Sequence, residues 1–369
     1  IHSVGYKDGY VYFSTSAVFR DGNASIAVRD SAGTILWSWH IWCSKEVWID
    51  QVYLNGAGVV MDRNLGATSA TPGSVGALGL LYQWGRKDPS MGPPTYNYSP
   101  INLNTAPYYD FSSDQKSAAE VTQFAQPTLR NGVENPMYLI LPSAQPLSYI
   151  FNWTYELYNF LWGYDHITGK ATKTIYDPCP YGYRVPSSEL GALFSMGSGS
   201  AGTYGYTRTV NGVQFFFPYA GFKGVDIGLN SLVASWQYVG QKGDYQSSMY
   251  CTDADAVNNG EINQYMHRAR VYISKEGSWS ETNVGTYNGN LHIDFANRRT
   301  AAPVRCVKDG KIGSITATLT PSIRNLVPNT QMTLSYKTHS YGSAIEYVTI
   351  MANYTTTSGE EKERVIRII

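Results

Sequence analysis

The sequence is poor in charged residues. Of its 369 residues only 15% are Asp, Glu, Lys or Arg, and 28 basic residues balance 28 acidic ones, so the formal net charge is zero. A nucleic acid or an anionic membrane surface would select a basic protein surface. The composition therefore argues against both kinds of partner.

Long apolar runs are missing as well. No stretch reaches the length needed to cross a bilayer, and the N-terminal residues do not have the pattern of a signal peptide. We expect no transmembrane segment in this chain. Because Ile1 is not an initiator methionine, we also expect a processed or trimmed product.

Metal-binding and nucleophile signatures are lacking too. The four cysteines form no Cys-x-x-Cys pair, the six histidines show no metal spacing, and no local signature supports a Ser-His-Asp triad. The glycines between Gly66 and Gly79 lack the Gly-Lys-Ser/Thr ending of a phosphate-binding loop. We therefore expect no cofactor, no metal and no catalytic residue. Four cysteines are compatible with an exported protein that carries one or two disulfides.

Aromatic residues are abundant, with 30 tyrosines and 9 tryptophans. Two interpretations stay open: the rings fill thin β cores, or some are exposed for contact with sugar or protein. Alternating apolar residues predict strands in many places, for example over 35–41, 269–273 and 291–295. Residues 89–150 read as long irregular loops. Short helices are expected at 80–84, 156–162 and 189–194.

The most informative stretch is Tyr176–Leu190, with the sequence YDPCPYGYRVPSSEL. Two prolines flank Cys179 and favour extended backbone there. Alternation from Tyr181 to Val185 predicts a short strand, after which Ser187 or Ser188 could cap a helix. The sequence thus predicts that Cys179 lies directly before a strand that leads into a helix.

This stretch resembles the CPxGWxxPS core of the domains named after the major paralogous proteins of Fibrobacter succinogenes. Three other segments, in the same order, resemble the version found in Bacteroidetes fimbrillin-associated surface proteins. Those segments are Met61–Thr68 (MDRNLGAT), Gly79–Pro89 (GLLYQWGRKDP) and Ala302–Asp309 (APVRCVKD). Such domains are C-type-lectin-like and share a fold with formylglycine-generating enzymes.

The resemblance implies an α+β fold class: a C-type-lectin-like domain with long loops and few short helices. We expect β lead-in strands over 1–45, as a remnant of or link to a fimbrillin-type β-sandwich. The lectin-like domain would cover 46–309, and a small β-sandwich-like module 310–369. About sixty residues is short for a sandwich, so the module is either incomplete or completed by the N-terminal strands.

The resemblance also implies a disulfide between Cys179 and Cys306, because lectin-like folds bring the beginning and the end of the domain together. For Cys43 and Cys251 two free thiols are slightly favoured over a second bond. Formylglycine generation needs a pair of cysteines near the last strand. Only Cys306 is present between 278 and 307, so that activity is not expected.

The binding face is expected on the interval 228–263, since lectin-like folds bind ligands on loops inserted before the final strands. Trp236 and Tyr250 in this interval can equally be core residues. The predicted exposed ligand-binding residues are Tyr238, Tyr245, Asp253 and Asp255. The oxygen donors around Asp253 and Asp255 do not follow an EF-hand register, so a solvated loop is the default and a calcium site the alternative.

We therefore expect a non-enzymatic cell-surface adhesin, a minor or tip subunit of an outer-membrane-attached fimbria. Its partners would be a host or bacterial surface glycan or protein and other fimbrial subunits. The alternative is a secreted carbohydrate-active enzyme or its accessory glycan-binding domain. Two acidic side chains that face each other across a cleft would favour that alternative.

Overall fold

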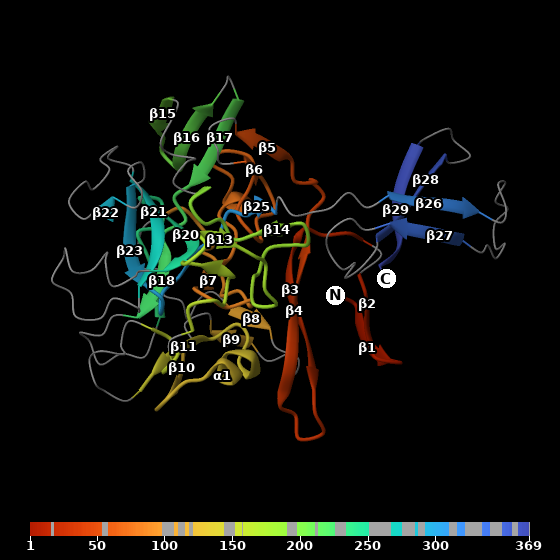
Figure 1. Cartoon of the computed structure of the whole chain (residues 1–369), viewed down its shortest axis with the longest axis horizontal. Coiled ribbons are helices and arrows are strands. Elements are labelled where there is room, and N and C mark those ends of the chain that lie inside the picture. The colour runs from red at the N-terminus through yellow and green to blue at the C-terminus, as the bar shows by residue number, and fades with distance from the viewer. Residues whose placement is uncertain are drawn as a thin grey trace. The chain divides into compact units, whose positions relative to one another are not determined.

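The computed structural model divides the chain into two compact units, Ile1–Lys308 and Asp309–Ile369 (Figure 1). Residues expected as separate lead-in strands and as the main domain thus belong to one unit. The structure describes residues 1–15, 18–53, 58–97, 107–109, 115–117, 121–143, 152–156, 158–189, 198–210, 213–225, 234–250, 267–274, 285–286, 292–309, 316–321, 334–339, 349–355 and 361–368.

Strands dominate both units. The helices with described bounds are α1 (Leu129–Glu134) and a 3-10 turn, η1 (Val75–Ala77), and Glu189 is also helical. The sheets are small, and all but one of the strand pairs are antiparallel. The expected α+β class, with the lectin-like arrangement of helices and sheets, is therefore wrong. The described chain is a β protein.

Two four-stranded sheets share one short stretch of chain near the end of the first unit. β24 (Ala301–Pro303) lies between β18 and β7, and β25 (Val307–Lys308) lies between β14 and β6. Residues 301–308 thus join the two sheets. The remaining strands of these sheets are β5 (Asp50–Tyr53), β6 (Gly58–Met61), β7 (Leu81–Gln83), β14 (Tyr183–Arg184), β18 (Phe222–Val225) and β19 (Ala234–Gln237).

A third four-stranded sheet has the order β20-β21-β23-β22, in which β20 (Lys242–Tyr250) pairs with β21 (His267–Ser274). β22 (Gly285–Thr286) and β23 (His292–Asn297) complete it. Smaller sheets surround these three. Their strands are β8 (Pro107–Tyr109), β9 (Gln115–Ser117), β10 (Val121–Phe124), β11 (Leu139–Pro142), β12 (Tyr164–Asp165), β13 (Lys170–Ala171), β15 (Ser198–Ala201), β16 (Gly205–Val210) and β17 (Val213–Pro218).

The N-terminal segment forms two hairpins. β1 (Ser3–Lys7) and β2 (Tyr10–Ser14) are joined by Asp8 and Gly9, which both have positive φ, as a type I′ turn requires. β3 (Gly22–Arg29) and β4 (Ile35–Cys43) form a longer hairpin, and the strand expected over 35–41 is confirmed. This second hairpin is attached to the body of the unit: Asn23 donates to the carbonyl of Gly66, and the indole of Trp42 to that of Ala67.

The main core is aromatic, and most of its tryptophans donate their indole N–H to backbone carbonyls. Trp84 donates to Ser247 at 3.0 Å, Trp153 donates to Trp84 at 2.6 Å, and Trp236 donates to Met91 at 3.1 Å. All three side chains are buried. A buried indole needs such an acceptor, so these contacts fix the rings as well as satisfy them. For these tryptophans the core interpretation is correct.

Two of the expected helices are absent. Residues 81–83 form β7, which pairs with β24, so tertiary pairing overrides the helical spacing at 80–84. The described part of 156–162 is irregular, with Phe160 exposed and Leu161 buried. Conversely, α1 lies inside the stretch expected to be loop, and Thr128 and Asn131 form a capping box at its N-terminus.

The second unit contains two antiparallel pairs in its described part. β26 (Thr316–Pro321) pairs with β27 (Leu334–His339), and β28 (Thr349–Thr355) pairs with β29 (Glu361–Ile368). This agrees with the expected β character of the module.

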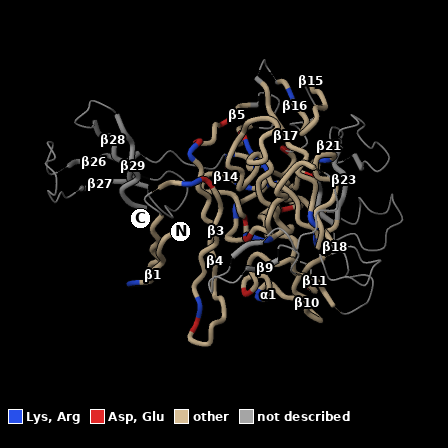
Figure 2. The backbone as a smooth tube through the Cα atoms, turned by 180° about the vertical axis from the view of Figure 1, so that it is seen from behind, with Lys and Arg blue, Asp and Glu red and all other residues tan. Residues whose placement is uncertain are grey.

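Charges are sparse along the described backbone, and Lys and Arg are interspersed with Asp and Glu (Figure 2).

A lysine lies inside the sheet that contains β18. Lys223 is 1% exposed, and its ammonium contacts the hydroxyl of Ser90 at 2.8 Å. Burial lowers the pKa of Lys223 from 10.5 to about 7. The native state therefore releases this proton at a lower pH than the unfolded chain does.

We predict that the free energy of unfolding rises with pH between about 7 and 10.5, because in that window the unfolded state holds more protons. One such group contributes a slope of up to about 1.4 kcal/mol per pH unit. Urea unfolding at several pH values should show that Lys223→Met flattens the slope. The exposed control Lys170→Met should leave it unchanged, and an unaltered slope in Lys223→Met would contradict the burial argument.

Candidate functional site

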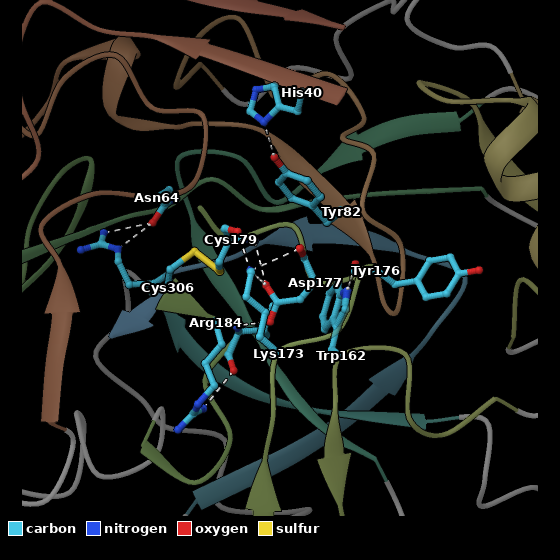
Figure 3. Close-up of a disulfide and its surroundings, with 12 residues drawn as sticks. His40, Asn64, Tyr82, Trp162, Lys173, Tyr176, Asp177, Cys179, Arg184 and Cys306 are labelled. Carbon is cyan, nitrogen blue, oxygen red and sulfur yellow. Dashed lines mark hydrogen bonds and ion pairs between the residues drawn. A yellow bond between two sulfur atoms is a disulfide. The ribbon is translucent and has the colours of Figure 1, made fainter. Parts of the chain in front are cut away.

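The stretch around Cys179 contains a disulfide surrounded by side-chain hydrogen bonds and an ion pair (Figure 3). Cys179 forms a disulfide with Cys306, with a Cα–Cα distance of 5.9 Å and 127 residues of sequence separation. The predicted bond is therefore confirmed. Both cysteines are buried, and Cys306 lies in the segment that joins β24 to β25. Cys43 carries a free thiol, and Cys251 lies outside the described residues.

Asp177 organises the turn before the disulfide. One carboxylate oxygen accepts from the backbone N–H of Cys179 at 2.8 Å and from Lys173 Nζ at 2.9 Å. The other accepts from the N–H of Val185 at 2.9 Å. Burial raises the pKa of Asp177, and these three donors oppose the shift. A short aspartate side chain thus holds the loop and the strand in one arrangement.

The segment after Val185 agrees with the expectation as far as it is described, because Glu189 is helical. The hydroxyl and backbone N–H of Ser187 both donate to Glu189, at 2.8 and 2.7 Å, and Arg184 forms an ion pair with the same carboxylate. The polar groups of Ser187 are therefore used to bind the carboxylate of Glu189. The helix expected over 189–194 lies outside the described residues beyond Glu189.

Polar residues from the other family-like segments are buried beside the disulfide. Arg305 donates to the side-chain oxygen of Asn64 at 3.1 and 3.0 Å and to the carbonyl of Phe216 at 2.9 Å. Arg86 donates to the carbonyls of Gly132 and Asn135 at 3.0 and 2.9 Å. Buried guanidinium groups with several carbonyl acceptors join loops that have few ladder hydrogen bonds. These motif residues therefore stabilise the fold by holding loops together.

His40 connects the β3–β4 hairpin to the body. Its Nε2 lies 2.9 Å from the side-chain amide oxygen of Asn23, and its Nδ1 lies 3.2 Å from the hydroxyl of Tyr82. Because an amide oxygen only accepts, Nε2 carries the proton and Nδ1 accepts from Tyr82. The neutral ring therefore matches both neighbours. Burial lowers the pKa of His40 to about 4.

The predicted ligand-binding residues have different outcomes. Tyr245 is fully buried, packs edge-on against Phe217, and donates its hydroxyl to the carbonyl of Pro218 at 2.9 Å. Its assignment as an exposed contact is wrong, because β20 is buried on both faces from Gly243 to Tyr250. Trp236 and Tyr250 are core residues, which was the alternative to a role in ligand binding. Asp253 and Asp255 lie outside the described residues.

Tyr238 is half-buried and lies in a turn between β19 and β20. Its φ of 58° is in the left-handed region, an uncommon conformation for a bulky side chain, and costs on the order of 1–3 kcal/mol. The ring lies 5.7 Å from that of Phe222, and the ammonium of Lys242 lies 4.1 Å from its centroid. An aromatic pair flanked by a cation therefore reaches the surface at a strained position.

The Tyr238 turn is held in place by backbone contacts. The carbonyl of Tyr238 accepts from Gln241 and Lys242 at 3.0 and 2.9 Å, and Gly240 donates to Tyr219 at 2.8 Å. A Cβ atom at Gly240 would lie 2.1 Å from the carbonyl oxygen of Tyr96. Because the backbone packs this closely, the turn cannot relax into a conformation that suits tyrosine better.

Sequence reasoning missed Phe222 as the neighbour of Tyr238 and Lys223 as a buried amine. The alternation Phe222-Lys223-Gly224-Val225 is a strand signal, but it does not indicate which face is buried. Cross-strand pairing settles the neighbours: Phe222 is opposite Gln237, and Lys223 is opposite Trp236. No signal in the sequence alone supplies that register.

Metal-binding groups and membrane spans were sought in the described residues. No group of three or more His, Cys, Asp or Glu side chains there could hold a metal ion. None of the described helices is long and apolar enough to cross a membrane. Comparison of the chain with protein-family models, with curated proteins and with solved structures finds no match.

Removal of the disulfide should destabilise the first unit strongly. A cross-link that closes a loop of this length stabilises by about 4–5 kcal/mol through the unfolded chain's entropy. We predict a loss of about 3–5 kcal/mol in the double variant Cys179→Ala/Cys306→Ala, measured by urea unfolding. Cys43→Ala is the matched control and should change stability far less. Equal stability of the double variant and the wild type would contradict the prediction.

Acid should weaken the attachment of the β3–β4 hairpin. The pKa of His40 is about 4 in the native state and about 6.5 when unfolded, so the unfolded chain binds more protons between these values. The free energy of unfolding should therefore fall as pH decreases from about 6.5 to 4. His40→Gln should reduce this dependence, whereas His2→Gln, at an exposed position, should not. A pH dependence that survives His40→Gln would disprove the assignment to this ring.

Proposed function

We propose that this chain is the adhesive part of a cell-surface protein and that it binds an extracellular ligand through the turn at Tyr238. The observation that carries the proposal is the strained aromatic residue at a rigid surface position. Backbone strain in a native structure persists where its surroundings enforce it, and it gathers at binding sites. Phe222 and Lys242 provide the apolar and cationic neighbours that a recognition surface uses.

Export from the cytoplasm is the second part of the proposal. The buried Cys179–Cys306 bond supports it, since structural disulfides form and persist in oxidising compartments. We propose an extracellular position at the cell surface, as a minor or tip subunit of a fimbria with other fimbrial subunits as partners. The four sequence motifs that resemble Bacteroidetes fimbrillin-associated proteins support this assignment.

The set of proposed ligand-binding residues is smaller than the set predicted from the sequence. Tyr245 is excluded by its burial, whereas Tyr238 remains, and Asp253 and Asp255 stay predictions. We propose that binding is not accompanied by catalytic turnover. The chain would thus act by attachment alone.

Binding of the purified chain to an array of glycans and extracellular proteins tests the proposal. We expect saturable binding to at least one ligand, weakened about tenfold or more when Tyr238→Ala, Asp253→Asn and Asp255→Asn are combined. Tyr12→Ala on the exposed β1–β2 hairpin is the matched control and should bind as the wild type does. Absence of any ligand, or release of a cleaved product from a bound one, would contradict an adhesive role.

A further inference from the structure

The turn that carries Tyr238 has a backbone better suited to another residue. Glycine or asparagine adopts the left-handed region at little cost, and tyrosine does not. The contacts of Gly240 with Tyr96 and Tyr219 fix the turn whatever side chain stands at 238. Gly221 fixes it from the other side, because a Cβ atom there would lie 2.1 Å from the carbonyl oxygen of Gln237. The backbone of this turn therefore does not require a tyrosine, whose ring contacts Phe222 and Lys242 and stays partly exposed.

The surroundings of the ring indicate what it could contact. Phe222 lies 5.7 Å away with an interplanar angle of 41°, so the two rings form a shallow, angled surface. Gln237, Gln241 and Lys242 are partly exposed around it. Aromatic faces attract polarised C–H bonds, and amides and an ammonium group can orient hydroxyl groups.

We propose that the accessible parts of Tyr238 and Phe222 form a stacking platform for the apolar face of a pyranose ring, so that the ligand is a glycan. This inference rests on the proposed function and names the chemical class of its ligand. A sugar presents an apolar C–H face and a rim of hydroxyl groups, and the platform presents rings and a rim of polar side chains.

A protein ligand fits this surface less well. A stable protein interface covers roughly 800 Å² on each partner, usually with a well-packed apolar centre. At the Tyr238 turn both rings are only partly exposed, and the flanking residues are polar. A single stacked sugar needs only the area of one or two rings. The small size and polar rim thus favour a glycan.

Substitutions at 238 separate a ligand contact from a structural role. Tyr238→Asn removes the ring but suits the left-handed backbone, so relief of strain should offset the lost contacts with Phe222 and Lys242 and the free energy of unfolding should stay close to that of the wild type. Its affinity for soluble oligosaccharides of glucose, galactose, mannose and N-acetylglucosamine should fall about tenfold or more, because stacking and ring burial are lost. Tyr238→Phe keeps the ring and should bind within about threefold of the wild type.

Titration calorimetry against these oligosaccharides, with urea unfolding of each variant in parallel, measures both quantities. Equal affinity of Tyr238→Asn and the wild type for a bound sugar would overturn the platform. Binding of the wild type to extracellular proteins but to none of the oligosaccharides would overturn the glycan assignment and leave the adhesive role intact. Absence of binding to both the oligosaccharides and the extracellular proteins would contradict the proposed function together with this inference.

Discussion

The bond between Cys179 and Cys306 is the constraint on which the architecture of the first unit depends. β24 and β25 are three and two residues long, yet each lies inside a four-stranded sheet. Such short strands form too few ladder hydrogen bonds to fix their own position. The disulfide and the buried guanidinium of Arg305 both hold the three residues between them. The disulfide thus holds the segment that joins the two sheets to the turn that precedes β14.

The loops of this protein depend on buried polar side chains to a similar degree. Asp177, Arg86 and Arg305 each satisfy several backbone groups that no regular strand would reach. Each is costly to bury alone, and each is paired with donors or acceptors. This explains why the motif segments have such a specific composition. Their polar residues hold loops together and carry no direct information about the ligand.

The sequence predicts two features of this chain well, one from a local pattern and one from the family resemblance. The strand at 35–41 follows from alternation, and the disulfide follows from the family-like segments around Cys179 and Cys306. The fold class and the exposure of Tyr245 fail for a common reason. Both depend on which residues of distant strands lie opposite each other, as with Leu81 and Pro303, and a single sequence does not contain that register.

The candidate site shows the same limit of sequence-based prediction, here for the exposure of individual aromatic residues. The aromatic content of 228–263 indicated a recognition surface, but it did not distinguish Tyr238 from Tyr245, which were both predicted to be exposed. One points into the core and the other reaches solvent because of a turn with left-handed backbone. That turn is set by Gly221 and Gly240 packing against other strands. Sequence patterns identify the interval, whereas tertiary packing selects the residue.

The disulfide also has a mechanical consequence for the proposed adhesive role. Tension applied along the chain passes from Cys179 to Cys306 through the covalent bond and bypasses the 127-residue interval that contains Tyr238. Fully extended, that interval would add roughly 400 Å of contour length, which the bond withholds. The residues proposed to contact the ligand lie inside this interval, so the flanking segments would bear the load in their place.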